Sequence, residues 1–279
     1  MQNFDVYCAT GTFTGRKNGR DHRLALTYGD QIHCDGYEVM VFEDWYDHLD
    51  TIIQDYRSHD IRSPVVHADK RVGDLICGDS TTSAAFAEAV ELWKVNCHFA
   101  AAIGARRVVT HPWGYPGSDS YLELVYERCG RLLDIAKTYG VDMVAENVIC
   151  THGSPIAHIE ELVGIYPDMG VTIDTRHMQF HAELVKTCAS PVWRSGNVRH
   201  IHISDYAGGY KDWDRLRVLP GPGEGDVDYR VFFQHLHDIA YEGTMTMESP
   251  SIPQEQGVDV ERLNDRLAFI RDGLHQNNT

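Results

Sequence analysis

Short runs of β-branched and apolar residues alternate along the whole chain with longer segments in which apolar residues recur every three or four positions. The short runs predict β-strands, and the longer segments predict amphipathic helices. Eight strands are expected, at Asp5–Ala9, Tyr37–Phe42, Pro64–Ala68, Arg107–Thr110, Asp142–Glu146, Val171–Asp174, His200–Ile203 and Thr244–Glu248. This regular alternation is typical of repeated βα units that build a parallel sheet.

The clearest helical patterns lie between these strands, at Ser83–Ile103, Tyr121–Tyr139, Ile156–Tyr166 and Tyr229–Tyr241. Because glycine commonly follows the last turn of a helix, we expect helices to end at Gly104, Gly140, Gly170 and Gly243. The stretch Gly209–Asp226 is rich in glycine and proline and predicts one long loop after the seventh strand. No linker divides the chain, so residues 1–279 are predicted to form a single (β/α)8 TIM barrel.

Composition supports this fold and narrows the choice of partners. The 279 residues suit a barrel of roughly 250 residues, and 43% hydrophobic with 24% charged residues is typical of a globular protein with a large core. Asp and Glu outnumber Lys and Arg by 41 to 25, which gives a net charge of −16. This charge repels a nucleic-acid backbone at long range, so no nucleic-acid partner is expected.

The sequence also points to a cytoplasmic protein without a membrane partner. The first residues, MQNFDVYCATGTFTG, lack the basic segment and apolar core of a secretory signal, and no apolar run is long enough to span a bilayer. The seven cysteines are odd in number, scattered and free of any CxxC pair. They are therefore expected to be reduced thiols.

Four of the late strands end in side chains that an apolar core would exclude. These are Glu146, Asp174, His202 and Glu248. In a barrel of parallel strands, the carboxyl-terminal strand ends meet at one mouth, and the active site lies there. Side chains alternate between the two faces of a strand, so each of the four shares a face with the residue two positions before it. If that face points inward, the four side chains converge.

Converging carboxylates would repel one another strongly unless a cation neutralised them. Three oxygen ligands and one imidazole favour Mn²⁺, Mg²⁺ or Co²⁺ over a thiolate-type zinc site, with Zn²⁺ as an alternative and Mn²⁺ preferred. Any one such residue would more often be a helix N-cap, a loop anchor or a surface charge. Four of them on successive strands, at the same end, favour one bound divalent ion.

Several motifs resemble the sugar isomerase/epimerase family of xylose isomerase-like barrels, and the ketose 3-epimerases in particular. They are AEN at Glu146, DTRH at Asp174–His177, and the runs HIHISD, GEGDVDY and MESP. The resemblance spans nearly the whole chain. It implies one metal ion bound by Glu146, Asp174, His202 and Glu248. It also implies substrate contacts by His177 and Glu38, and it makes a homo-oligomer the expected assembly.

A more distant resemblance extends to the endonuclease IV-like branch of the same superfamily. His67 in VVHAD and His111 in VVTHPWG stand where that branch places further zinc ligands. The branch also needs an Asp-x-His pair in the loop after strand seven, and Gly209–Asp226 contains no histidine. His67 and His111 are therefore expected to contact substrate, to hold a second metal ion, or to be neutral histidines of the barrel mouth.

The predicted site suits proton transfer next to a ketose carbonyl, through an enediolate. Glu146 and Glu248 come from strands three apart and would flank a sugar or polyol substrate, one removing a proton and the other returning it. Return to the opposite face gives epimerisation, and return to the neighbouring carbon gives isomerisation. Loss of a β-hydroxyl would instead make a lyase. A phosphodiesterase and a non-catalytic binding barrel are the remaining alternatives.

Three further residues are candidates for substrate contact or for support of the site. Trp113 would form an apolar platform for a sugar, or else pack on the rim. Arg217, with Arg215 in the same loop, would bind a hydroxyl, carboxylate or phosphate, or else be a solvated charge. Asp205, three residues after His202, would orient a ligand or cap the next turn.

Overall fold

Eight parallel strands close into a barrel in the computed structural model, which describes residues 4–77, 83–113, 118–253 and 255–276. The strands pair in sequence order, and the first closes the barrel against the last. They are β1 (Val6–Ala9), β2 (Tyr37–Met40), β3 (Val65–His67), β4 (Arg107–Thr110), β5 (Asp142–Glu146), β6 (Gly170–Asp174), β7 (Val198–Ile203) and β8 (Thr244–Met247). The predicted (β/α)8 barrel is confirmed.

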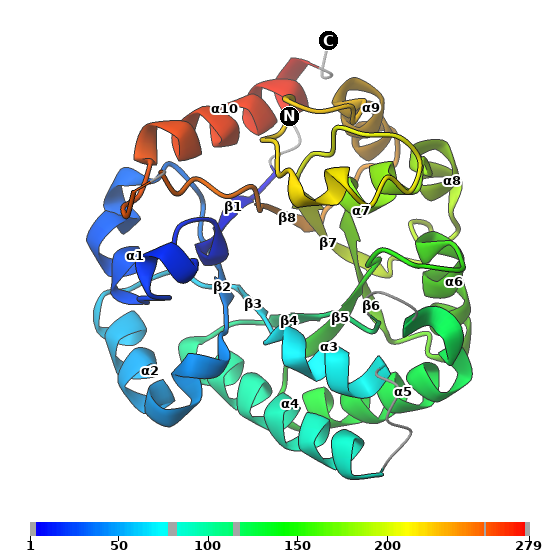
Figure 1. The fold of residues 1–279 in the computed structure, drawn as a ribbon, viewed down its shortest axis with the longest axis horizontal. Coiled ribbons are helices and arrows are strands. Elements are labelled where there is room, and N and C mark those ends of the chain that lie inside the picture. Colours follow the sequence, from blue (N-terminus) through cyan, green and yellow to red (C-terminus); the bar gives the residue numbers. More distant parts are fainter. Residues whose placement is uncertain (1–3, 78–82, 114–117, 254, 277–279) are drawn as a thin grey trace.

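The helices form a ring outside the strands (Figure 1). They are α1 (Arg23–Tyr28), α2 (Leu49–Ser58), α3 (Lys70–Cys77), α4 (Ser83–Ile103), α5 (Leu122–Thr138), α6 (Pro155–Ile165), α7 (Thr175–Phe180), α8 (Leu184–Ala189), α9 (Tyr229–Asp238) and α10 (Val260–Gln276). All four helices predicted from periodicity are present. The long loop predicted after the seventh strand is also present, and its only regular structure is a single 3-10 turn at Arg215–Arg217.

Of the four glycines that were predicted to end helices, two are confirmed and two are wrong. Gly104 and Gly140 follow α4 and α5 with positive φ angles of 82° and 70°, a conformation that favours glycine. Gly170 is instead the first residue of β6, and Gly243 directly precedes β8. Helix α9 ends earlier than its pattern suggested, and Ala240 takes the positive φ there.

The barrel interior is divided into an apolar floor and a polar mouth. The floor is a small separate cluster of fully buried side chains, Tyr7, Val65, Val109 and Val144. Because side chains alternate along a strand, the residue two positions after each floor residue points into the same interior, closer to the carboxyl-terminal mouth. Val144 is followed in this way by Glu146. The main hydrophobic core lies between the strands and the helices.

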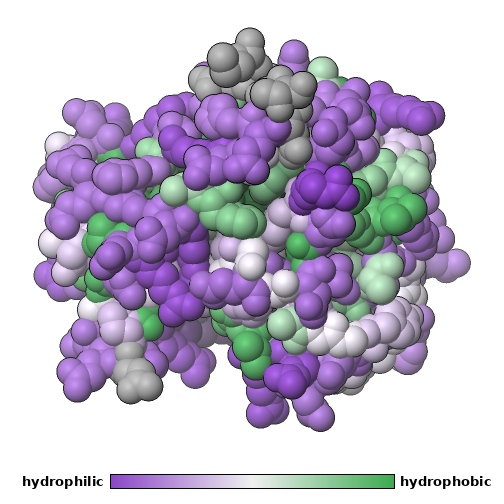
Figure 2. Space-filling model, turned by 90° about the horizontal axis from the view of Figure 1, so that it is seen from above, coloured by the Kyte–Doolittle hydropathy of each residue, from purple (hydrophilic) through white to green (hydrophobic). Residues whose placement is uncertain are grey.

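Polar residues cover most of one face of the molecule. Figure 2 shows this face, on which hydrophilic residues predominate and apolar residues occupy small areas between them. Among the described residues, no helix combines the length and apolar character needed to cross a membrane. None of the seven cysteines forms a disulfide bond, and five of them are buried.

Candidate metal centre

The four predicted metal ligands lie together at the carboxyl-terminal mouth of the barrel. Glu146 and Asp174 are the last residues of β5 and β6, His202 lies near the end of β7, and Glu248 directly follows β8. One potential ligand atom from each lies within 4.8 Å of those of the other three. Glu146, Asp174 and His202 are at most 2% exposed. Four successive strands thus aim these donors at a common point.

Asp174 is fixed by the start of the helix that follows it. Its Oδ1 accepts a hydrogen bond of 2.9 Å from the backbone N–H of His177, so it caps α7. Its own backbone N–H donates to Oδ1 of Asn147 at 2.6 Å, which ties the ends of β5 and β6 together. Asp174 therefore caps a helix and also stands at the predicted ligand position. The two roles are compatible because a carboxylate has two oxygens.

One ring nitrogen of His202 is bound by a neighbouring carboxylate, and the other has no hydrogen-bond partner. Its Nε2 lies 3.1 and 3.2 Å from the two carboxylate oxygens of Glu38. Its Nδ1 lies 3.4 Å from Oε1 of Glu146 and 3.2 Å from Oε2 of Glu248, without the alignment of a hydrogen bond. Nδ1 therefore faces the carboxylates of the centre and has no hydrogen-bond partner there.

The surroundings of the centre shift the pKa values of Glu146 and Glu248 in opposite directions. Burial raises the pKa of Glu248 to about 7, and the negative charges of Glu38 and Glu146 add to this effect against the opposing influence of His202. Burial also acts to raise the pKa of Glu146, but His111 and His202 outweigh it and hold that pKa well below its usual range. Such a separation is characteristic of acid and base pairs in enzymes.

These residues fit a divalent cation with oxygen and nitrogen ligands. Oε2 of Glu146 and Nδ1 of His202 are buried without a hydrogen-bond partner. Buried unpaired polar atoms each cost about 1–3 kcal/mol. A cation among the three carboxylates would bind both atoms and neutralise the repulsion between the charges. The donors at this point include no thiolate.

A second group with metal-ligand spacing adjoins the first and shares Glu146 with it. Nε2 of His67 and Nε2 of His111 lie 3.5 and 3.0 Å from Oε2 of Glu146. Burial lowers the pKa of His111 to about 3, against the opposing influence of Glu146. The Nδ1 of His67 lies 2.7 Å from the carbonyl oxygen of Ala68, which leaves Nε2 to face Glu146.

A cavity of about 410 Å³ opens above the four predicted ligands. Three predicted substrate-binding residues line it, namely His67, His111 and His177. Glu146, Asp174 and Glu248 form part of its wall. Nδ1 of His177 lies 3.3 Å from Oε1 of Glu146. A small polar molecule in this cavity would therefore reach the metal ligands and these histidines together.

Three other predicted substrate contacts do not line the cavity. Glu38 is completely buried beneath the mouth and binds His202 and His200. Trp113 is completely buried and donates its indole N–H to the carbonyl oxygen of Val148 at 2.8 Å, so it packs instead of forming a platform. Arg217 is exposed on the loop after β7. The structure supports substrate contact by none of them.

Arg176 is a basic residue of the cavity wall that was not predicted from the sequence. It stands two positions after Asp174 in DTRH, and its guanidinium donates to the carbonyl oxygen of Leu216, which also lines the cavity. Its Nε is buried without a hydrogen-bond partner. Lys70, Asp74 and Met40 also line the cavity and were missed. Met40 lies on β2, and Lys70 and Asp74 lie on α3. The strand ends in this part of the chain lack the pattern of charged residues that marked the late strands.

Asp205 fastens the long loop that follows β7. Its carboxylate accepts hydrogen bonds from the backbone N–H groups of Tyr206 at 2.8 Å, Gly223 at 2.9 Å, Gly225 at 3.1 Å and Val227 at 3.1 Å. The two ends of the loop are thereby joined through one buried side chain. This loop contributes Leu216, Leu219 and Pro220 to the cavity wall.

Known proteins share both the sequence pattern and the fold. The family described as "Xylose isomerase-like TIM barrel" matches residues 30–271. A ketose 3-epimerase from Arthrobacter globiformis is 29% identical over 167 residues, or 52% of this chain and 52% of that protein. The chain thus aligns with about half the length of this curated relative.

Two solved structures have the same fold at low sequence identity. A D-allulose 3-epimerase from Methylomonas sp. in complex with D-allulose superposes with a TM-score of 0.73, at 17% identity over 98% of both chains. The IOLI protein with a bound zinc atom superposes with a TM-score of 0.75, at 16% identity over 98% of this chain and 99% of that one.

Proposed function

The chain belongs to the xylose isomerase-like TIM-barrel family, and we propose that it is a divalent-metal-dependent epimerase or isomerase of a small ketose or related polyol ketone. The observation that carries this proposal is the convergence of Glu146, Asp174, His202 and Glu248 within 4.8 Å at the barrel mouth. The sugar epimerases among its relatives support the same chemistry.

The residues around the cavity would divide the reaction between binding and proton transfer. A divalent ion, with Mn²⁺ preferred, would polarise the substrate carbonyl and stabilise the charge that develops on its oxygen. Glu146 and Glu248 approach the substrate position from β5 and from the end of β8, and their pKa values are shifted in opposite directions. One would remove the proton next to the carbonyl and the other would return it to the enediolate.

The contacts to substrate hydroxyls would come from the histidines and the arginine of the wall. His177 lies beside Glu146, so it would donate a hydrogen bond to an oxygen on the carbon that loses the proton. Arg176 offers a charged donor farther out, next to the loop after β7. A hydroxyl, carboxylate or phosphate at the far end of the substrate would satisfy its unpartnered Nε.

Solvent exchange during turnover tests the reaction directly. Protein loaded with Mn²⁺ is incubated in D2O with a panel of ketoses, free and phosphorylated, and the products are read by NMR after removal of the metal. We expect deuterium at the carbon next to the carbonyl and an epimer or aldose as product. Glu146→Gln and Glu248→Gln should each lower kcat by about 100-fold or more, because they remove the acid or base. A panel with no deuterium incorporation would refute the proposal, and a new enone absorbance would identify a lyase.

The group formed by His67, His111 and Glu146 favours one second candidate, a two-metal phosphodiesterase. That activity predicts two metal ions per chain and cleavage of abasic-site DNA. The net charge of −16 opposes approach of a polyanion. Metal content near one ion per chain, with no cleavage of such DNA, would dismiss this candidate.

A further inference from the structure

Glu38 is a buried charge that the proposed reaction does not use. It lies on β2 with 0% exposure, among the residues that fill the barrel interior. Its neighbour across the sheet, Val65 of β3, belongs to the apolar floor. Removing a carboxylate from water costs several kcal/mol even after the protein relaxes. An apolar side chain at Glu38 would spare that cost, so the carboxylate needs another explanation.

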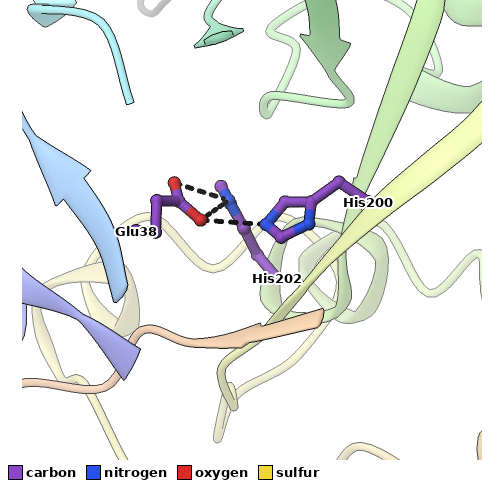
Figure 3. Close-up of side chains that lie close together, drawn as sticks. All are labelled: Glu38, His200 and His202. Atoms are coloured by element: carbon purple, nitrogen blue, oxygen red, sulfur yellow. Dashed lines mark hydrogen bonds and ion pairs between the residues drawn. The ribbon is translucent and has the colours of Figure 1, made fainter. Parts of the chain in front are cut away.

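The explanation lies in what Glu38 binds. Figure 3 shows its carboxylate facing the rings of His200 and His202, both of which come from β7. Nε2 of His200 lies 2.9 Å from Oε2, and Nε2 of His202 lies 3.1 and 3.2 Å from the two oxygens. An ionised carboxylate only accepts hydrogen bonds, so both Nε2 atoms carry hydrogen.

The other side of the network fixes Glu38 in place. Nδ1 of His200 lies 2.7 Å from the hydroxyl oxygen of Thr244. That oxygen accepts a hydrogen bond of 3.2 Å from the guanidinium of Arg107, so the hydroxyl donates its own hydrogen to Nδ1. The hydroxyl oxygen of Thr246 lies 3.0 Å from Nε2 of the same ring. Thr244, His200 and Glu38 therefore form an ordered chain that ends at His202.

We infer that Glu38 is a positioning residue that holds His202 with its hydrogen on Nε2 and directs the Nδ1 lone pair at the metal centre. Nδ1 faces Glu146 and Glu248 and has no hydrogen-bond partner of its own. A histidine ligand that donates its other N–H to a carboxylate is a better electron donor and is fixed in orientation. This inference rests on the proposed function, because it requires that a metal ion binds there.

Metal affinity separates this role from a merely structural one. The dissociation constant for Mn²⁺ is measured by competition with a chelating dye on wild-type protein, Glu38→Ala and Glu38→Gln. Loss of such a partner typically weakens metal binding by about 10–100-fold, and we expect this for Glu38→Ala. Glu38→Gln should lie between the two, because its amide oxygen still accepts one hydrogen bond but carries no charge.

Val65→Ala is the matched control. It removes volume at the strand position that pairs with Glu38 and keeps the carboxylate itself, so it should lower the melting temperature and leave the dissociation constant within twofold of wild type. Circular dichroism shows that each variant is folded. If Glu38→Ala destabilises the barrel too far, the Gln variant still decides the question, since it keeps the volume of Glu38.

Histidine NMR on protein loaded with diamagnetic Zn²⁺ gives a readout that stability does not affect. In wild-type protein, His202 should carry its hydrogen on Nε2 with a strongly downfield proton signal, and this signal should move upfield in Glu38→Gln. A hydrogen on Nδ1 of His202, or metal affinity within twofold of wild type in folded Glu38→Ala, would overturn the inference and leave the proposed function standing. A wild-type protein that binds no divalent ion would overturn both. Wild-type metal binding without any ketose turnover would refute the proposed function alone.

Discussion

At the scale of single residues, two side chains of the barrel mouth each make a second contact that fixes their direction. Asp174 caps α7 through Oδ1, and His202 is held through Nε2 by Glu38. A side chain that is already immobilised loses less entropy when it binds a ligand. The structure therefore presents a prearranged set of donors, as metal-assisted catalysis requires.

Arg176 and Arg217 allow a matched comparison within the same region. Arg176 lines the cavity, whereas Arg217 is exposed and lies outside it. Arg176→Ala should raise KM about tenfold and change kcat less, because it removes a charge-assisted contact to substrate worth about 1.5 kcal/mol. Arg217→Ala should leave both constants within twofold of wild type. Steady-state kinetics on the ketose with the highest turnover decides this, and equal effects of the two substitutions would contradict the assignment.

The sequence predicted which four side chains converge at the mouth, but it did not predict that Glu38 lies beneath the cavity, and it left two alternatives open for Trp113 and for Arg217. These four side chains could be predicted because each stands at the carboxyl-terminal end of a strand. In a parallel barrel all such ends lie at the same mouth. Whether Glu38 faces the cavity or lies beneath it depends on how far along β2 it stands relative to the mouth. That depth follows from the register between strands, which a pattern of residues does not give.

At the scale of elements, the loop after β7 depends on one carboxylate. Asp205 accepts four backbone hydrogen bonds from both ends of that loop. Asp205→Ala removes all four hydrogen bonds and should cost about 3 kcal/mol, or roughly 5–10 °C in melting temperature. Trypsin should then cut at Arg215 or Arg217 in protein that is otherwise folded.

Asp214→Ala supplies the control for the loop, because Asp214 is an exposed residue in the same segment. Its melting temperature and its rate of tryptic cleavage should match those of wild type. Asp205→Ala protein that resists trypsin as well as wild type does would show that the loop is held by other contacts.

The strands were predictable to within two residues at each end, because short apolar runs between polar segments mark them clearly. The short helices α1, α7 and α8 were not identified, since six residues each are too few to establish a period. Helix α7 is instead set by tertiary structure, because its cap is the candidate ligand Asp174. Local sequence patterns thus predicted the strands, whereas the short helix α7 depends on contacts at the site.

At the scale of the whole molecule, the centre joins strands that are far apart in sequence, from β5 to the end of β8. A ligand that binds only the folded barrel stabilises it by mass action, by about 2.7 kcal/mol at a concentration 100 times its dissociation constant. Mn²⁺ added to chelator-treated protein should therefore raise the melting temperature by roughly 5–10 °C. His202→Ala should abolish the rise. Equal melting temperatures of the wild-type protein with and without Mn²⁺ would contradict this expectation.

Anomalous diffraction from crystals grown with Mn²⁺ is the sharpest test of the proposed metal site, because it locates the ion itself. We predict one strong anomalous peak per chain, within coordination distance of Glu146, Asp174, Glu248 and Nδ1 of His202. A peak bound only by His67, His111 and Glu146, or no peak at the barrel mouth in crystals that hold manganese, would contradict it.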